Sequence, residues 1–172
     1  MGKQRARGAD EKAARRQVIL EAARSLGEKS DYDEITMAKI ARQAGLAKGT
    51  LYLYFRTKEE LFLALVIDEL DDWFKELERV ILENGPLEVP GALAEVLTPT
   101  VMAKPFLLKL LTILHGVLER NIDEAQAETF KRTLLLSMAH IGQVLEQQVE
   151  GFGAGDGVRF LLLLDALVLG LY

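Results

Sequence analysis

The stretch TMAKIARQAGLAKGTLYLYF, residues 36–55, has the pattern of two short helices joined by a tight turn. Gly45 permits the left-handed backbone that such a turn often requires. Ala41 is small enough for the two helices to cross closely. A shared apolar core would be formed by Ile40, Ala44, Leu46, Leu51 and Phe55. This is the arrangement of a helix-turn-helix, whose second helix enters the major groove of DNA.

The residues left outside that core suit contact with a nucleic acid. Tyrosine and threonine hydroxyls and lysine ammonium groups bind phosphate, and a lysine at the start of the second helix can reach a guanine edge. The outward set on the second helix is Ala47, Lys48, Gly49, Thr50, Tyr52 and Leu53, with Tyr54 at its edge. The same pattern also fits a solvated lysine and half-buried tyrosines, and spacing alone leaves both interpretations open.

Lys58 and Thr36 extend the candidate site on either side. Lys58 falls in the first turn of the next predicted helix, where the helix dipole disfavours a cation. Its position is easier to understand if a phosphate docks there. Thr36 is a plausible N-cap for the first helix of the pair.

The whole chain has helical periodicity and no strand-like alternation, so we expect an all-α fold. A basic, disordered arm is predicted over residues 1–10, and a capping box is predicted from Thr57 to Glu60. The polar stretch 30–34 is predicted as a loop. Helices are predicted at about 11–29, 37–44, 48–54, 58–83, 90–101, from 105, at 123–150 and from 157 to the end. No capping residue follows the last of these, which suggests a truncated chain.

Composition separates a basic N-terminal third from an acidic remainder. Residues 1–60 hold 13 Lys and Arg against 9 Asp and Glu, a net charge of +4, whereas residues 61–172 hold 8 against 17, a net charge of −9. There are no cysteines, which excludes disulfides and thiol chemistry. No secretory signal is present, and the longest apolar tract, 160–172, is too short to span a membrane. We expect a cytoplasmic protein without a membrane partner.

The stretch 35–66 closely resembles the TetR/AcrR family of bacterial transcriptional repressors. The matching elements are Thr36, Ile40, Ala41, Ala44-Gly45, Gly49-Thr50-Leu51-Tyr52, Tyr54-Phe55 and Lys58-Glu59-Glu60-Leu61. The resemblance implies an all-helical homodimer with an N-terminal three-helix DNA-binding domain over 11–56. A helical, antiparallel ligand-binding and dimerisation body would follow over 57–172. It places the operator contacts on Thr36, Lys48, Gly49, Thr50, Tyr52, Tyr54 and Lys58. Arg5 and Arg7 could add contacts in the minor groove.

By the same resemblance, the partners are a double-stranded DNA operator, a small-molecule effector and a second copy bound through the C-terminal helices. The predicted mechanism is a two-state switch in which the helix at 58–83 links the effector to the spacing of the recognition helices. An apolar or aromatic effector would fit the candidate lining: Trp73, Leu77, Met102, Phe106, Leu110, Leu114, His115, Phe130 and Met138. The alternative is that most of these residues only pack the core.

Other functions have weaker support. The chain has no convergent acid, base and nucleophile set, so we expect no enzyme activity, no catalytic residues and no cofactor. His115 and Glu119 share a helix face but have no third partner, so we predict no metal site. His140 is isolated. The remaining alternative is a helical small-molecule carrier or adaptor with a vestigial DNA-binding domain, which would show no salt-dependent binding to duplex DNA.

Overall fold

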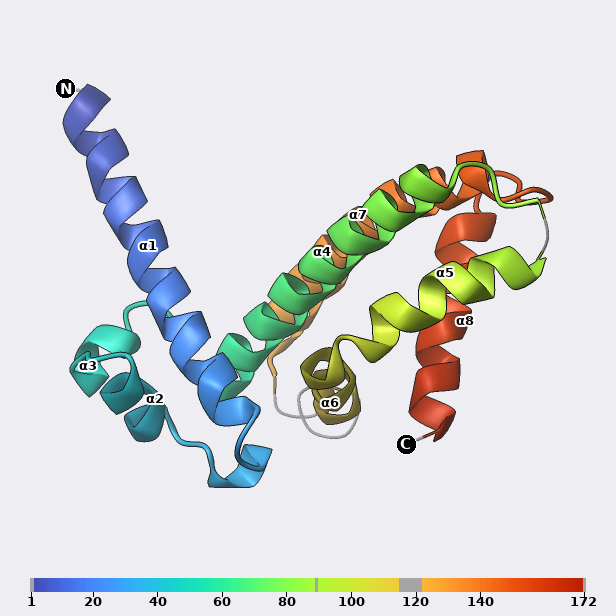
Figure 1. Cartoon of the computed structure of the whole chain (residues 1–172). Coiled ribbons are helices and arrows are strands. Elements are labelled where there is room, and N and C mark those ends of the chain that lie inside the picture. The colour runs from blue at the N-terminus through green and yellow to red at the C-terminus, as the bar shows by residue number, and fades with distance from the viewer. Residues whose placement is uncertain (1, 89, 115–121, 172) are drawn as a thin grey trace. The chain divides into compact units, whose positions relative to one another are not determined.

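The computed structural model describes residues 2–88, 90–114 and 122–171, and over these the chain is helical. The predicted all-α fold with an N-terminal helix-turn-helix is confirmed (Figure 1). Its elements are α1 (Gly2–Gly27), the 3-10 helix η1 (Tyr32–Glu34), α2 (Met37–Gln43), α3 (Lys48–Leu51), α4 (Lys58–Asn84), α5 (Pro90–Met102), α6 (Pro105–Ile113), α7 (Glu124–Gln148) and α8 (Asp156–Leu171).

The chain divides into two compact units, Met1–Leu65 and Val66–Tyr172. The division falls inside α4, whereas the sequence suggested a boundary before that helix. The first turns of α4 pack with the N-terminal unit because Leu61, Phe62 and Leu65 are fully buried. One continuous helix therefore contributes residues to both units.

Helix α1 differs from the prediction at its start. It begins at Gly2, so residues 2–10 are helical where a disordered arm was expected. This segment has no proline and is rich in Ala, Arg, Lys and Gln, all of which favour helix. Ile19, Leu20, Ala22 and Ala23 are buried, whereas the neighbouring Val18 is exposed. The side chains of Arg5 and Arg7 lie outside the described part of the chain.

Two local devices form the turn between α2 and α3. The Thr36 hydroxyl accepts a hydrogen bond from the Lys39 amide at 3.2 Å, which confirms the predicted N-cap. At the other end Gly45 has φ +67°, and the Leu46 amide donates to the Ala41 carbonyl at 2.9 Å. The Gly45 amide also donates to the Arg42 carbonyl, which completes a Schellman motif. These bonds fix the direction in which α3 leaves the turn.

The start of α4 is capped on both sides, although the predicted reciprocal pair is only half present. The Glu60 amide donates to the Thr57 hydroxyl at 3.0 Å, as expected for a capping box. The Glu60 carboxylate accepts from the Arg56 amide instead of the Thr57 amide. The Glu60 side chain therefore bonds to the residue before the predicted one. This bond links the segment that follows α3 to the first turn of α4.

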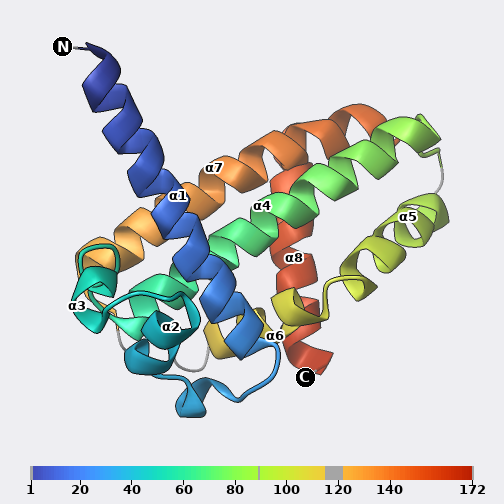
Figure 2. The same cartoon turned by 60° about the vertical axis from the view of Figure 1, so that its left-hand side comes forward.

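In the C-terminal unit, α4 and α7 run in the same direction, as Figure 2 shows. The sequence suggested an antiparallel body; this pair is parallel because α5 and α6 lie between the two helices in sequence and α5 returns along α4. Ser137 donates to Asp71 at 2.7 Å, and His140 lies 3.0 Å from Glu78 across this pair of helices. Leu87 bonds with the backbone at the end of α7.

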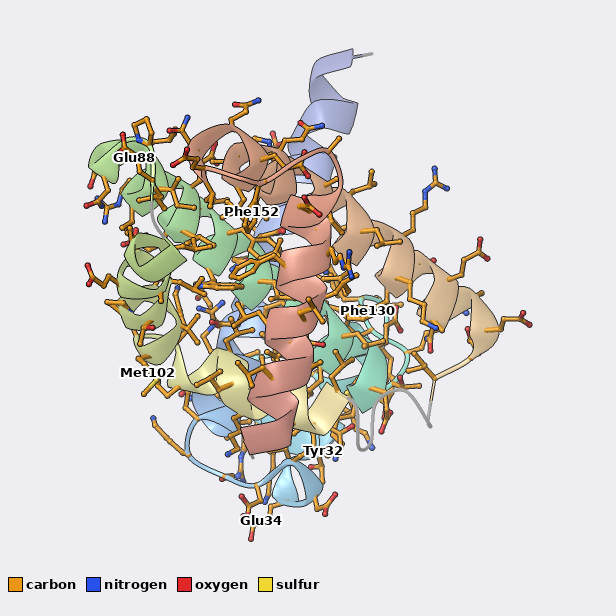
Figure 3. The ribbon with its side chains drawn as sticks, turned by 90° about the vertical axis from the view of Figure 1, so that its right-hand side faces the viewer. Tyr32, Glu34, Glu88, Met102, Phe130 and Phe152 are labelled. Atoms are coloured by element: carbon orange, nitrogen blue, oxygen red, sulfur yellow. The ribbon has the colours of Figure 1, made fainter. Side chains whose placement is uncertain are left out.

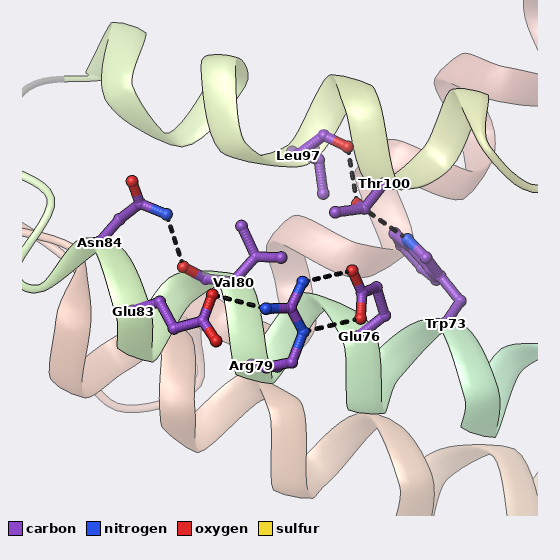
Figure 4. A network of polar contacts seen from close by, with 8 residues as sticks. All are labelled: Trp73, Glu76, Arg79, Val80, Glu83, Asn84, Leu97 and Thr100. Carbon is purple, nitrogen blue, oxygen red and sulfur yellow. Dashed lines mark hydrogen bonds and ion pairs between the residues drawn. The ribbon is translucent and has the colours of Figure 1, made fainter.

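Helix α5 returns along α4, and a buried polar contact joins them (Figure 4). The Trp73 indole nitrogen donates to the Thr100 hydroxyl at 3.1 Å, and this hydroxyl donates to the Leu97 carbonyl at 2.8 Å. Both polar groups are therefore satisfied inside the core. On the solvent side of α4, Arg79 forms ion pairs with Glu76 and Glu83.

Helix α8 crosses α7 at a contact between glycines. A β-carbon added at Gly157 would overlap the Gly142 carbonyl, and one added at Gly142 would lie 2.8 Å from Val158 Cγ2. The Glu146 carboxylate accepts from the amides of Gly155 and Gly157 at 2.9 and 3.1 Å, and so caps α8. The glycine-rich segment 151–157 is therefore a helix junction.

No single helix among the described residues is long and apolar enough to cross a membrane; only α5 and α6 taken together, bent by 83°, meet the length and composition criteria.

Candidate DNA-binding surface and ligand cavity

The α2–α3 pair presents a polar outer face over an apolar inner one. Leu51 and Phe55 are buried, together with Ile40 and Ala41 of α2. Ala44 and Leu46, predicted in the same core, are only half-buried. The predicted DNA contacts remain accessible: Thr36, Lys48, Gly49 and Tyr52 are exposed, and Thr50, Tyr54 and Lys58 are half-buried. The residues on which the DNA-binding interpretation depends are therefore outside the protein interior.

This face has a single sign of charge. The segment 36–58 contains Lys39, Arg42, Lys48, Arg56 and Lys58 and no Asp or Glu. The first four of these side chains are exposed. A surface of this kind attracts a polyanion and gives affinity that falls with salt.

Lys48 and Tyr52 lie one helical turn apart on α3. The Lys48 ammonium lies 5.8 Å from the centre of the Tyr52 ring, at the outer limit of a cation–π contact. Thr50 lies between them in sequence, and its amide donates to the Ala47 carbonyl in the first turn of α3. The arrangement leaves the ammonium and both hydroxyls available to an outside partner.

Lys58 is in a different situation. Its ammonium donates to the Tyr32 carbonyl at 2.9 Å and lies 3.7 Å from the centre of the Tyr32 ring. The Tyr32 hydroxyl donates to the Glu59 carboxylate at 2.9 Å. We call Tyr32, Lys58 and Glu59 the Tyr32 cluster. It joins η1 to the first turn of α4, and Tyr32 and Glu34 of η1 are labelled in Figure 3.

Burial shifts the pKa values of two members of the Tyr32 cluster, Tyr32 and Lys58. Removal from water raises the pKa of Tyr32, and the hydrogen bond to the Glu59 carboxylate raises it further. Burial lowers the pKa of Lys58, while the nearby carboxylates of Glu59 and Asp33 oppose this shift. Lys58 therefore has an internal partner that explains its position at the start of α4 without a phosphate.

Sequence reasoning missed two features of this unit. Tyr32 lies in a segment predicted as a polar loop, yet it is buried and its ring meets Phe62 edge-on at 4.9 Å. Arg42 was not among the predicted contacts, although it is exposed on the last turn of α2. The sequence offered one signal for each. Tyr32 is the aromatic residue in the polar run 30–34, and Arg42 is a basic residue one helical turn after Ala38.

The C-terminal unit contains an apolar cavity of 240 Å³ among α4, α5, α6, α7 and α8. Among the described residues, its lining includes two charged side chains, Lys131 and Asp165. The apolar lining residues are Leu70, Trp73, Phe74, Val101, Leu107, Leu108, Leu111, Leu114, Phe130, Leu134, Met138, Leu161, Leu162 and Leu164. An apolar small molecule suits such walls.

Four of the nine predicted lining residues line this cavity: Trp73, Leu114, Phe130 and Met138. Leu77, Phe106 and Leu110 are buried but pack elsewhere in the core. Met102 is 66% exposed at the end of α5, so its prediction as a lining residue is wrong. Figure 3 labels Met102 and Phe130. His115 and its neighbour Glu119 lie outside the described residues.

Two family models match the chain. Residues 19–65 match the bacterial regulatory proteins of the tetR family, and residues 67–172 match a tetracyclin repressor-like C-terminal domain. The boundary between the two matches coincides with the boundary between the two structural units.

Curated relatives are regulators by name. The chain is 34% identical over 67 residues to the fatty acid metabolism regulator protein of Bacillus subtilis, which is 39% of this chain and 34% of that protein. It is 27% identical over 106 residues to the transcriptional repressor KstR of Mycolicibacterium smegmatis, which is 61% of this chain and 52% of that protein. The chain thus spans between a third and about half of the length of these two relatives.

Solved structures show the same fold. A TetR-family transcriptional regulator from Mesorhizobium loti is 26% identical, with a TM-score of 0.61 over 86% of this chain and 75% of that one. The TetR-family repressor AlkX from Dietzia is 22% identical, with a TM-score of 0.54 over 91% and 90% of the two chains.

Proposed function

The chain belongs to the TetR family of bacterial regulatory proteins, and we propose that it is a transcriptional repressor that binds a palindromic operator as a homodimer and releases it on binding a small apolar or aromatic effector. The observation that carries the proposal is the α2–α3 face, where exposed basic and hydroxyl side chains surround a helix whose inner side is buried. Its place of action is the cytoplasm, where the operator lies.

The operator contacts follow from that face. We assign Lys48 to a base edge and Thr36, Thr50, Tyr52 and Tyr54 to the DNA backbone, because a lysine reads guanine while hydroxyls bind phosphate. Gly49 has open space where a side chain would start, so the α3 backbone can approach the groove closely. Lys58 is supported less well than the other six predicted contacts, since its ammonium already has an internal partner.

The effector site is assigned to the 240 Å³ cavity, whose walls favour an apolar ligand. Helix α4 supports the link between effector and operator, because Leu70, Trp73 and Phe74 line the cavity while Lys58 and Glu59 of the same helix contact η1. A ligand that prefers one position of α4 lowers operator affinity by its differential binding to the two states.

We assign the contact with a second copy of the chain to the outer face of α8. Leu161 of this helix is buried, while Leu163 and Leu167 are exposed. A homodimer would cover these leucines and present two α3 helices about 34–36 Å apart, one turn of DNA. Analytical ultracentrifugation is expected to show a dimer, and a Leu163→Glu, Leu167→Glu variant is expected to show a monomer.

The DNA-binding proposal is tested by selecting a duplex from a random library and titrating it by fluorescence anisotropy at several salt concentrations. A repressor of this kind shows a steep fall of log K with log salt, with a slope of about −0.9 for each phosphate neutralised. Failure to select any duplex, or binding that does not depend on salt, would favour the carrier function instead.

A further inference from the structure

Leu53 is the most exposed large apolar side chain in the described part of the chain, at 77% of its surface. It directly follows Tyr52, the residue that caps α3, and its amide donates to the Thr50 carbonyl at 3.1 Å. The Phe55 amide donates to the Leu51 carbonyl at 3.1 Å, so the chain continues in helical turns to Phe55. An exposed leucine on a turn held in this way contributes little to the folding of its own unit.

Helical geometry places Leu53 opposite the buried face. Each residue of a helix turns by about 100°, so a residue two positions from Leu51 and two from Phe55 points about 200° away from either. Leu51 and Phe55 are the buried pair. Leu53 therefore forms the outermost point of this turn. Gly49, four residues earlier on the same side, has no side chain and nothing within 4 Å of its β-carbon position.

The surroundings of Leu53 indicate which partner it meets. No acidic residue occurs between 36 and 58, and Lys39, Arg42 and Lys48 are exposed on α2 and α3. A protein partner for an apolar residue would not require this charge, whereas duplex DNA does. The floor of the major groove is polar except for one group, the C5 methyl of thymine.

We propose that Leu53 is a specificity-determining residue that packs against a thymine methyl group in each operator half-site. The inference rests on the proposed function, because it assigns a base to one more residue of the same surface. Lys48 and Leu53 would then read neighbouring positions by different chemistry, the first by hydrogen bonding and the second by apolar contact.

The test replaces each thymine of the selected operator, one at a time, by deoxyuridine, which removes only the methyl group. For the wild-type protein, one position in each half-site is expected to lose about fourfold in affinity, the effect of exposing one methyl-sized group. For Leu53→Ala, affinity for the thymine operator falls and the same position becomes insensitive to deoxyuridine. Leu53→Met, which retains an apolar side chain, restores part of the sensitivity.

Two controls separate this inference from the proposed function. Leu82→Ala removes another exposed leucine, on α4, and is expected to leave operator affinity unchanged. If salt-dependent binding is present but every thymine tolerates deoxyuridine, or if Leu53→Ala keeps the wild-type sensitivity, the Leu53 assignment is wrong and the function stands. If no duplex binds at all, the function itself fails. A change in oligomeric mass of Leu53→Ala without DNA would instead make Leu53 a protein contact.

Discussion

At the scale of single residues, the position of a cation does not reveal its partner. Lys48 and Lys58 lie at the starts of successive helices, and the sequence indicated a DNA contact for both, a guanine edge for Lys48 and a phosphate for Lys58. The structure distinguishes them, because Lys48 is exposed while Lys58 donates to the Tyr32 carbonyl and lies over the Tyr32 ring. Lys58 is therefore better suited to positioning η1 than to binding DNA.

This distinction predicts different salt dependences. Lys58→Met should leave the slope of log K against log salt unchanged, even if it weakens operator binding, because no phosphate loses its cation. Arg42→Met, which removes an exposed cation of the α2–α3 face, should reduce the magnitude of the slope by about 0.9. Anisotropy titrations at four or more salt concentrations measure both. A slope reduced to the same extent by Lys58→Met would identify this lysine as a phosphate ligand.

The Tyr32 cluster also predicts a pH dependence of stability. The pKa of Tyr32 is raised in the folded state, so the neutral hydroxyl contributes to the free energy of unfolding. This contribution is present below the unfolded pKa of about 10. It is lost as pH rises above that value, by up to about 1.4 kcal/mol per pH unit. Tyr32→Phe removes a hydrogen bond to a carboxylate, which costs about 1.5–3 kcal/mol near neutral pH. The difference in unfolding free energy between the two proteins should therefore shrink above pH 10.

Urea unfolding of wild type and Tyr32→Phe at several pH values checks this expectation. Lys58, whose pKa is lowered, contributes with the opposite sign, but it is present in both proteins and cancels in the comparison. A difference that stays constant through pH 11 would show that the Tyr32 hydroxyl ionises as freely in the folded state as in the unfolded chain.

At the scale of helices, periodicity and capping signals predicted most of the elements but not their environment. Thr36 and Gly45 begin and end α2 as predicted, because caps are local in sequence. The spacing of Leu77, Phe106 and Leu110 correctly indicated burial, yet it could not distinguish a packed core from a cavity wall. That distinction depends on which helices meet, which is a property of the tertiary fold.

The crossing of α7 and α8 shows the same limit. The segment 151–157 is rich in glycine. The amides of Gly155 and Gly157 donate to the Glu146 carboxylate, and Gly157 lies against the backbone of Gly142. Nothing in the sequence pairs Gly142 with Gly157, since they lie on different helices and no local motif relates them.

The close crossing of α7 and α8 predicts that one added methyl group at Gly157 lowers the stability of the protein. Gly157→Ala would place a β-carbon against the Gly142 carbonyl and force the two helices apart, at a cost of about 1–3 kcal/mol or more. Gly170→Ala, in the same helix, meets open space and should be neutral or slightly stabilising. Chemical denaturation compares the two. Equal stabilities for both variants would mean that α7 and α8 are not in close contact.

At the scale of the whole molecule, the sequence predicted two parts with a boundary before α4, whereas the two compact units divide inside α4. The basic N-terminal third and the acidic remainder correspond to two units, but α4 belongs to both. A boundary inside a helix leaves no Gly, Pro or polar linker to indicate it. The regulatory proposal depends on this continuity, because residues of α4 line the cavity in one unit and contact η1 in the other.

A substitution that fills the cavity should therefore abolish the response to the effector and leave DNA binding intact. Leu134→Trp adds bulk to the cavity wall, whereas Leu136→Trp, on the same helix, adds it at a side chain that is 68% exposed. Only Leu134→Trp is expected to abolish ligand binding. Ligand binding is detected by the fluorescence of Trp73 in the wild-type protein and by calorimetry in the two variants. Both should keep operator affinity. Loss of ligand binding in Leu136→Trp as well would place the effector elsewhere.

The central claim is that the outer face of α2 and α3 binds duplex DNA. It is tested most directly by the operator affinity of a Lys48→Ala, Thr50→Ala, Tyr52→Ala variant, measured by anisotropy beside a Thr129→Ala, Arg132→Ala, Thr133→Ala control on the exposed side of α7. We predict that the first variant folds normally and loses operator binding by at least a hundredfold, while the control binds like the wild type. Wild-type affinity in the first variant, or an equal loss in the control, would contradict the account.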